Sequence, residues 1–154
     1  MILSIVSGKG GTGKTTVAVN LALSLSLNGR KVEVLDCDVE EPNIHLFIRP
    51  NIDKETEVVV QKPVVDEEAC TRCGICEDFC QFNSIAVLSK VIVFEELCHG
   101  CGGCSYVCPQ GAITETQRRV GVVRVGKGEG IKVVYGTLDI GEYMPSPVIR
   151  CVRN

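Results

Sequence analysis

Length, composition and charge place this chain among compact proteins with an aliphatic core. It has 154 residues, enough for one ordinary domain or two small ones, with 45% hydrophobic and only 5% aromatic residues. The net charge is −3, but residues 63–113 hold seven acidic and two basic side chains, a local net charge of −5. This acidity argues against a nucleic-acid partner for the region. It suits electrostatic docking of a basic protein. The alternative interpretation is an acidic surface that is solvated and binds no partner. No apolar run reaches the ~18 residues of a membrane span.

A buried strand and a glycine-rich loop open the chain. Residues 2–6 form an apolar run with β-branched members, which predicts a strand of a parallel sheet. Residues 7–16, SGKGGTGKTT, contain the pattern G-x4-G-K-[ST], whose glycines let backbone N–H groups surround phosphate oxygens. Lys14 supplies charge to the β- and γ-phosphates, and the Thr15 hydroxyl can ligate Mg²⁺. The predicted nucleotide-binding residues are Gly8, Lys9, Gly10, Gly11, Thr12, Gly13, Lys14, Thr15 and Thr16.

A helix follows the loop. It is expected over residues 14–28, with Val17, Leu21 and Leu25 on one face and Gly29 as its C-terminal stop. A glycine-rich turn without a ligand is the alternative for the loop itself. The strand before it and the helix after it favour a phosphate site at the positive end of the helix.

GKGGTGKTT, residues 8–16, resembles the deviant Walker A loop of the MinD/ParA/Mrp ATPases, which include the nitrogenase iron protein. The resemblance implies an ATP-dependent homodimer in the full-length protein. It also implies that Lys9 reaches the partner's nucleotide, a role like that of an arginine finger.

Two aspartates follow the second predicted strand, residues 31–35. The family match implies that Asp36 binds Mg²⁺ or its waters and that Asp38 orients the attacking water. The catalytic residues are therefore expected to be Lys9, Lys14 and Asp38. The alternative for both aspartates is to cap a turn or a short helix starting near Asn43. Cys37 is expected to be a small buried side chain.

Residues 49–62 change in character and are expected to be a linker with one short strand. Two matched cysteine runs follow, each of the form C-x2-C-x2-C-x3-C. Three closely spaced thiolates can hold one iron–sulfur cube while the fourth points to the other cube. This spacing assigns Cys70, Cys73, Cys76 and Cys108 to one [4Fe-4S] cluster and Cys98, Cys101, Cys104 and Cys80 to another.

Zinc and disulfides are the alternatives for these cysteines. Zinc would leave the third cysteine of each run without a role, and disulfides need an oxidising compartment. The block from Pro63 to about Thr114 resembles bacterial-type 2[4Fe-4S] ferredoxins. His99 is at most a residue that tunes a cluster, because eight ligands are already present. Cluster chemistry and the absence of a visible targeting segment predict a cytoplasmic protein.

The last part of the chain returns to alternating strands. Residues 120–125 and 131–135 flank a glycine-rich turn and predict a hairpin, and residues 137–140 are a candidate further strand. A helix is expected to begin near Pro147, and Cys151 is expected to be buried. The Asp-x-Pro-Pro-Gly switch of the family does not occur in this sequence. The chain is therefore interpreted as the N-terminal half of such an ATPase.

The predicted fold is α/β: a partial P-loop parallel-sheet domain interrupted by a ferredoxin-like α+β module. Its divisions are residues 1–62, 63–114 and 115–154. The predicted function is an ATP- and Mg²⁺-binding iron–sulfur protein that couples ATP to low-potential electron transfer through two [4Fe-4S] clusters. A redox protein or an iron–sulfur acceptor protein is the expected partner. Two alternatives stay open: an Mrp-type iron–sulfur cluster carrier ATPase, and a non-enzymatic electron carrier with a regulatory nucleotide site.

Overall fold

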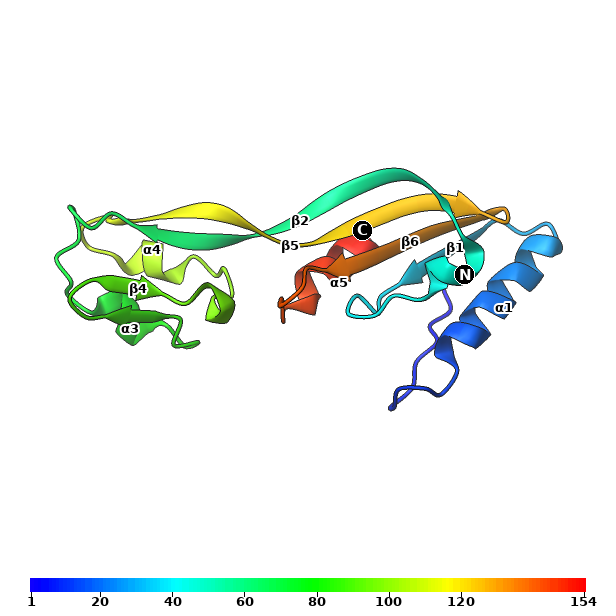
Figure 1. Ribbon diagram of the computed structural model, residues 1–154, viewed down its shortest axis with the longest axis horizontal. Coiled ribbons are helices and arrows are strands. Elements are labelled where there is room, and N and C mark those ends of the chain that lie inside the picture. The colour runs from blue at the N-terminus through cyan, green and yellow to red at the C-terminus, as the bar shows by residue number, and fades with distance from the viewer. The chain divides into compact units, whose positions relative to one another are not determined.

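The computed structural model describes all residues from Met1 to Asn154 (Figure 1). They form two compact units. The first unit comprises Met1–Val58, Gly121–Ile140 and Pro145–Asn154, and the second comprises Val59–Val120 and Gly141–Met144. The divisions expected after residues 62 and 114 fall inside two strands, β2 (Asn51–Val65) and β5 (Ile113–Gly128). These strands supply residues to both units.

A four-stranded mixed sheet has the strand order β1-β6-β5-β2. β1 (Val32–Asp36) runs parallel to β6 (Ile131–Leu138), with Leu35 opposite Val134. β5 runs antiparallel to β6. The chain is thus a mixed α/β protein, and the parallel β1–β6 pair accords with the predicted parallel sheet.

A tight hairpin joins β5 to β6, as the glycine-rich turn predicted. Gly128 pairs with Ile131, which leaves Glu129 and Gly130 as a two-residue turn. Both turn residues have positive φ, 50° and 74°. Two successive left-handed residues suit the right-handed twist of the flanking strands, and glycine adopts this conformation without steric cost.

Helices cover both faces of the sheet within the first unit. Val133 and Tyr135 of β6 lie in one core cluster with residues of α1 and α2. On the other face, a Cβ added to Gly136 would lie 2.5 Å from Val148 Cγ1, in α5. Neighbouring strand residues point to opposite faces, so α5 covers the face opposite α1 and α2. The bounds are α1 Lys14–Leu27, α2 Ile44–Ile48 and α5 Pro145–Arg153.

The second unit repeats one short motif. In each half a glycine with positive φ, Gly74 at 82° and Gly102 at 72°, precedes a one-turn helix. The two helices pack closely, and the ring of Phe79 fills the space that a side chain at Gly103 would need. The bounds are α3 Ile75–Phe79, β3 Ile85–Val87, β4 Val91–Val93, η1 Glu95–Leu97 and α4 Gly103–Val107. β3 and β4 form an antiparallel pair, which accounts for the strand expected between the cysteine runs.

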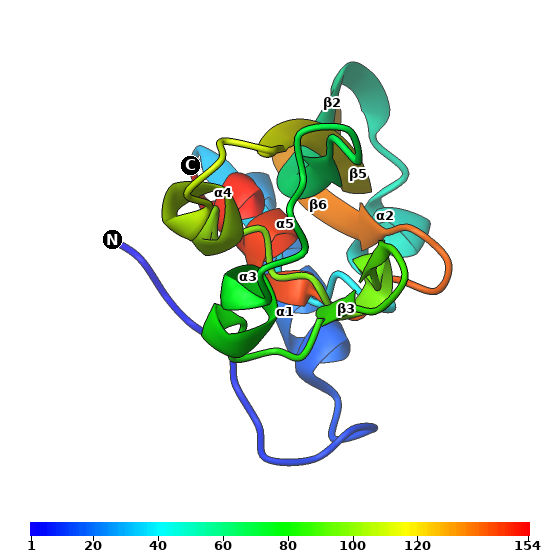
Figure 2. The same ribbon diagram turned by 90° about the vertical axis from the view of Figure 1, so that its left-hand side faces the viewer.

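Two sequence-based strand predictions were wrong. Residues 2–6 form no strand, and Figure 2 shows the segment before α1 as a coil. An apolar run becomes a strand only where another strand satisfies its backbone, and β1 pairs with β6 instead. The expected further strand over residues 137–140 is the end of β6 followed by a turn.

The region expected to be a linker, residues 49–62, lies mostly within the 15-residue strand β2. Its first part is highly charged and exposed, which is typical of a strand with no neighbour on one side. Composition suggested a linker because the stabilising partner, β5, lies far along the chain.

Burial also differs from expectation at three positions. Cys37 and Cys151, both expected to be buried, are exposed. Val17 of α1 is 55% exposed, whereas Val19 and Ala22 face the core. Apolar residues occur nearly all round α1, so periodicity alone did not identify the buried face. None of the helices combines the length and apolarity needed to span a membrane.

Candidate functional site

Four cysteines from both halves of the repeat line one hollow in the second unit. Cys70, Cys73 and Cys76 come from the first run, and Cys108 closes the second run. Apolar side chains, among them Val91, complete the wall. The structure therefore brings together the four residues that the spacing grouped.

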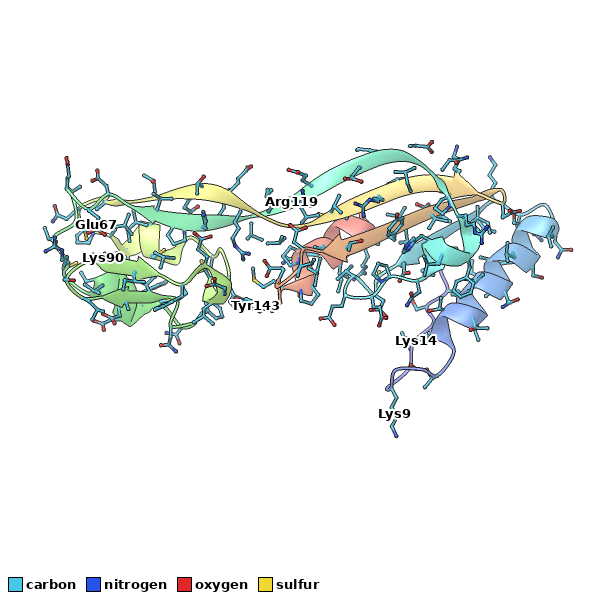
Figure 3. All side chains as sticks on the ribbon, in the orientation of Figure 1. Lys9, Lys14, Glu67, Lys90, Arg119 and Tyr143 are labelled. Carbon is cyan, nitrogen blue, oxygen red and sulfur yellow. The ribbon has the colours of Figure 1, made fainter.

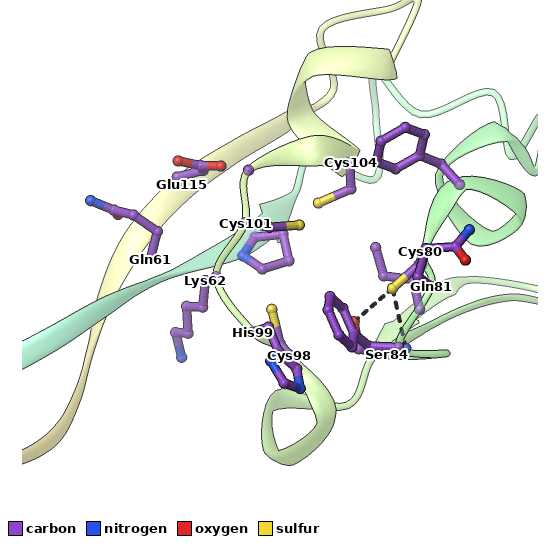
Figure 4. Close-up of a pocket in the computed structure, with 16 residues that line it drawn as sticks. Gln61, Lys62, Cys80, Gln81, Ser84, Cys98, His99, Cys101, Cys104 and Glu115 are labelled. Carbon is purple, nitrogen blue, oxygen red and sulfur yellow. Dashed lines mark hydrogen bonds between the residues drawn. The ribbon is translucent and has the colours of Figure 1, made fainter. Parts of the chain in front are cut away.

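The other four cysteines line a second hollow of the same unit, shown in Figure 4. Cys98, Cys101 and Cys104 lie on the loop before α4 and on α4 itself, and Cys80 follows α3. Phe79, Phe82 and Ile85 are among the apolar residues that line it. Each hollow thus takes three cysteines from one run and one from the other.

The donor set suits an iron–sulfur cluster better than a single ion. No group of three or more His, Cys, Asp or Glu side chains is arranged to hold one metal ion. A zinc ion needs every sulfur within about 2.3 Å of one point. A four-iron cube is wider and bonds to thiolates spread around it, which matches four sulfurs around a hollow.

Local backbone donors also reach the sulfurs. The N–H of Arg72 donates to Cys70 Sγ at 3.4 Å in the first hollow, and the N–H of Ser84 donates to Cys80 Sγ at 3.4 Å in the second. Such bonds stabilise thiolates and are among the factors that set cluster potentials. Both hollows therefore fit anionic sulfur ligands.

Burial changes the pKa values of several cysteine thiols in the two hollows. It raises the pKa of Cys104 to about 11 and raises that of Cys76, with smaller opposing contributions from backbone N–H groups. Protein-bound metals need the thiolate, so these residues release protons when they bind metal. Burial also acts to raise the pKa of Cys80, but hydrogen bonds from Ser84 and neighbouring backbone outweigh it and lower that pKa.

Several residues beside the second hollow, apart from His99, were not identified from the sequence. Ser84 contacts Cys80, and Glu115 lines the hollow with the Cys98 run. His99 stacks on Phe82, with ring centroids 3.7 Å apart, and meets Tyr143 edge-on at 6.2 Å. Of these residues, only Ser84 could have been identified from the sequence, because the matching position of the second repeat is an alanine.

The glycine-rich loop belongs to the first unit and is organised by its own side chains. The hydroxyl of Thr12 donates to Ser7 Oγ at 2.7 Å, and the Ser7 hydroxyl donates to the carbonyl of Lys9 at 2.8 Å. Lys9 is exposed and Lys14 is half-buried; Figure 3 shows Lys9 at the turn of the loop. The turn needs glycine at residue 11, where φ is 69°.

The loop ends at the free N-terminus of α1. Gly13 is the N-cap, with φ 88°, and no side chain caps the helix. The first N–H groups of a helix have no partner within it and carry partial positive charge. A 14-residue helix that starts at Lys14 without a cap is suited to bind an anion such as phosphate.

The two aspartates after β1 differ in environment. Asp36 is 6% exposed, and its carboxylate accepts hydrogen bonds from the N–H groups of Asp38, Asn43 and Ile44. It therefore caps the short helix α2, the alternative considered for it. Asp38 is exposed at the same turn.

The family model of the CobQ/CobB/MinD/ParA nucleotide binding domain matches residues 3–143. The chain belongs to this family. The resemblance to MinD/ParA/Mrp proteins that the glycine-rich loop indicated is thereby confirmed. The matched range contains the loop, both aspartates and all eight cysteines of the repeat.

Curated relatives of this MinD/ParA family member fall into two kinds. An uncharacterized protein of Methanocaldococcus jannaschii is 36% identical over 154 residues, which is 100% of this chain and 54% of that protein. An iron-sulfur cluster carrier protein of the same organism is 65% identical over 40 residues, 26% of this chain and 14% of that protein. An iron-sulfur cluster carrier protein of Bacillus subtilis is 41% identical over 66 residues, which is 40% of this chain and 19% of that protein. The chain thus spans about half the length of the relative that matches it throughout.

Proposed function

We propose that this chain is part of an ATP-dependent iron–sulfur protein that carries two [4Fe-4S] clusters. The observation that carries the proposal is the pair of four-cysteine hollows inside a MinD/ParA-family domain. Their ligands are Cys70, Cys73, Cys76 and Cys108 for one cluster, and Cys98, Cys101, Cys104 and Cys80 for the other. Bound clusters supply one-electron chemistry or serve as cargo.

The nucleotide site is proposed from the loop and the start of α1. Backbone N–H groups of residues 8–16 bind the phosphates, Lys14 neutralises their charge, and Thr15 and Asp36 hold Mg²⁺ directly or through water. Asp38 orients water, and Lys9 reaches the nucleotide of a second copy. The exposure of Lys9 supports this last role, because its side chain is free to extend to a partner.

Cluster delivery is the better supported use of this machinery. Relatives described as iron-sulfur cluster carrier proteins match part of the chain at 41% to 65% identity. In this role the cluster is the cargo: acceptor thiolates replace the chain's own cysteine ligands, and no net oxidation or reduction is needed. ATP binding at the loop would change how firmly the cysteine unit holds its cargo.

Electron transfer is the second candidate. The observation that favours it is the completeness of both ligand sets, with four cysteines around each hollow and Cys76 and Cys98 buried. Full ligation by partly buried thiolates favours retention of a cluster over release. The acidic charge of residues 63–113 supports a basic redox partner.

One experiment separates the two uses. The full-length protein is loaded anaerobically with ⁵⁷Fe clusters and mixed with an apo-protein that recovers activity on receiving a [4Fe-4S] cluster. MgATP-dependent movement of ⁵⁷Fe to the acceptor supports delivery. Retention of all ⁵⁷Fe, together with MgATP-dependent reduction of a one-electron acceptor by the pre-reduced protein, would instead establish electron transfer. A Lys14→Ala protein loaded in the same way is the matched control.

A further inference from the structure

The two halves of the internal repeat differ at the position four residues after the last cysteine of each run. Ser84 stands four residues after Cys80, and Ala112 stands four residues after Cys108, the matching cysteine of the second run. Both positions are buried, with 3% and 1% of the residue exposed. At this place the two halves of the unit differ by a hydroxyl group enclosed in protein.

The extra hydroxyl contacts a sulfur. Ser84 Oγ lies 3.1 Å from Cys80 Sγ. A dashed line marks this contact in Figure 4, beside another to the backbone nitrogen of Ser84. In the free protein either atom can donate this hydrogen bond. A thiolate bound to iron has no proton, so there the Ser84 hydroxyl must be the donor. Water cannot compete well at a buried site, which strengthens the electrostatic effect of the bond.

Each hollow has a backbone hydrogen bond to a cysteine sulfur, so these bonds do not distinguish the two sites as the hydroxyl does. A backbone N–H donates to a cysteine sulfur at 3.4 Å in each of them, from Arg72 to Cys70 and from Ser84 to Cys80. The hydroxyl has no counterpart at Ala112, whose side chain is a methyl group.

We propose that Ser84 raises the reduction potential of the cluster bound by Cys80 and the Cys98 run, and that Ala112 leaves the other cluster without this contribution. This inference rests on the proposed function, because it requires both clusters. One-electron reduction adds a negative charge to a cluster and its thiolates. A donor on a thiolate stabilises the reduced form more than the oxidised form, so the potential rises.

Charged neighbours also influence each site, so the hydroxyl alone does not decide which potential is higher. Arg72 lines one hollow, and Lys62 and Glu115 line the other. The effect of Ser84 is therefore defined as the change when the hydroxyl is removed. A residue that shifts one potential alone gives the protein a means to set the direction of electron flow between two otherwise similar sites.

The test uses two reciprocal variants of the full-length protein. Each protein is loaded anaerobically, reduced stepwise with dithionite, which supplies one electron to each cluster, and followed by EPR. Ser84→Ala should lower the midpoint potential of one cluster and leave the other unchanged. Ala112→Ser should raise the potential of the cluster that Ser84→Ala did not affect. Ser84→Thr keeps the hydroxyl and should keep the original potential.

The outcomes separate this inference from the proposed function. Iron and sulfide analysis of the unmutated protein tests for the two clusters, and their absence overturns both proposals. Two clusters whose potentials do not move in Ser84→Ala overturn the role of Ser84 alone. Equal shifts of both potentials would also overturn it, because a general structural disturbance, rather than one hydrogen bond, would be the cause.

Discussion

The carboxylate of Asp36 holds the start of α2, because its Oδ2 accepts a hydrogen bond from the backbone N–H of Ile44 at 3.1 Å. It accepts further bonds from Asn43 and Asp38, at 3.1 Å and 3.2 Å. Replacing Asp36 by alanine would leave these donors without that partner, and buried unsatisfied groups cost about 1–3 kcal/mol each. We expect Asp36→Ala to lower the free energy of unfolding by about 2 kcal/mol, measured by urea denaturation without nucleotide.

Asp38→Ala is the matched control for this prediction. Asp38 is exposed at the same turn, so its removal should change stability by less than about 0.5 kcal/mol. If the two variants unfold at the same urea concentration, the hydrogen bonds of Asp36 do not matter for stability.

The pairing of cysteines across the two runs can be tested directly. Reconstituted protein should contain about eight irons and eight sulfides, the content of two four-iron clusters. Cys80→Ser should perturb the cluster of the Cys98 run, although Cys80 belongs to the first run, and Cys70→Ser should perturb the other. EPR spectra in which both variants alter the same cluster would contradict this pairing.

The two remaining cysteines serve as controls for ligand identity. Cys37 and Cys151 are exposed and line neither cysteine hollow. Cys37→Ala and Cys151→Ala should therefore leave the iron content unchanged. Loss of iron in either variant would mean that the ligand set is wrong.

The two lysines of the loop should behave differently. Lys14 begins α1 beside its free N–H groups, whereas Lys9 is exposed in the preceding turn. Lys14→Ala should abolish MgATP binding in isothermal titration calorimetry, because it removes the charge placed for the phosphates. Lys9→Ala should spare binding to the monomer and weaken nucleotide-dependent dimerisation of the full-length protein. Equal losses of monomer affinity in the two variants would show that Lys9 acts within its own subunit.

The packing of α5 on the sheet gives a stability prediction. Val148 is 0% exposed, and its side chain lies against Gly136 of β6. Val148→Ala removes buried methyl groups and leaves a cavity, so we expect a loss of about 2 kcal/mol in the free energy of unfolding. Val17→Ala, on an exposed position of α1, should change it by less than about 0.5 kcal/mol. Thermal denaturation followed by circular dichroism would reveal the difference.

Most of the candidate site could be predicted from the sequence because its determinants are local. Cys70, Cys73 and Cys76 are separated by two residues each, so a single loop must carry them around one centre, and the structure places Cys108 with them. The glycine-rich loop, the start of α1 and the Glu129–Gly130 turn likewise depend on the conformations open to a few neighbouring residues.

Only the tertiary structure decided features that depend on partners distant in the chain. β2 is a strand because β5 lies beside it, while residues 2–6 have strand-like composition but no strand beside them. Asp36 caps a helix because the chain turns back after β1, and Ser84 acquires importance because burial holds its hydroxyl against Cys80. Hydrogen bonds and burial depend on which segments meet in space, and local residue preferences do not contain that information.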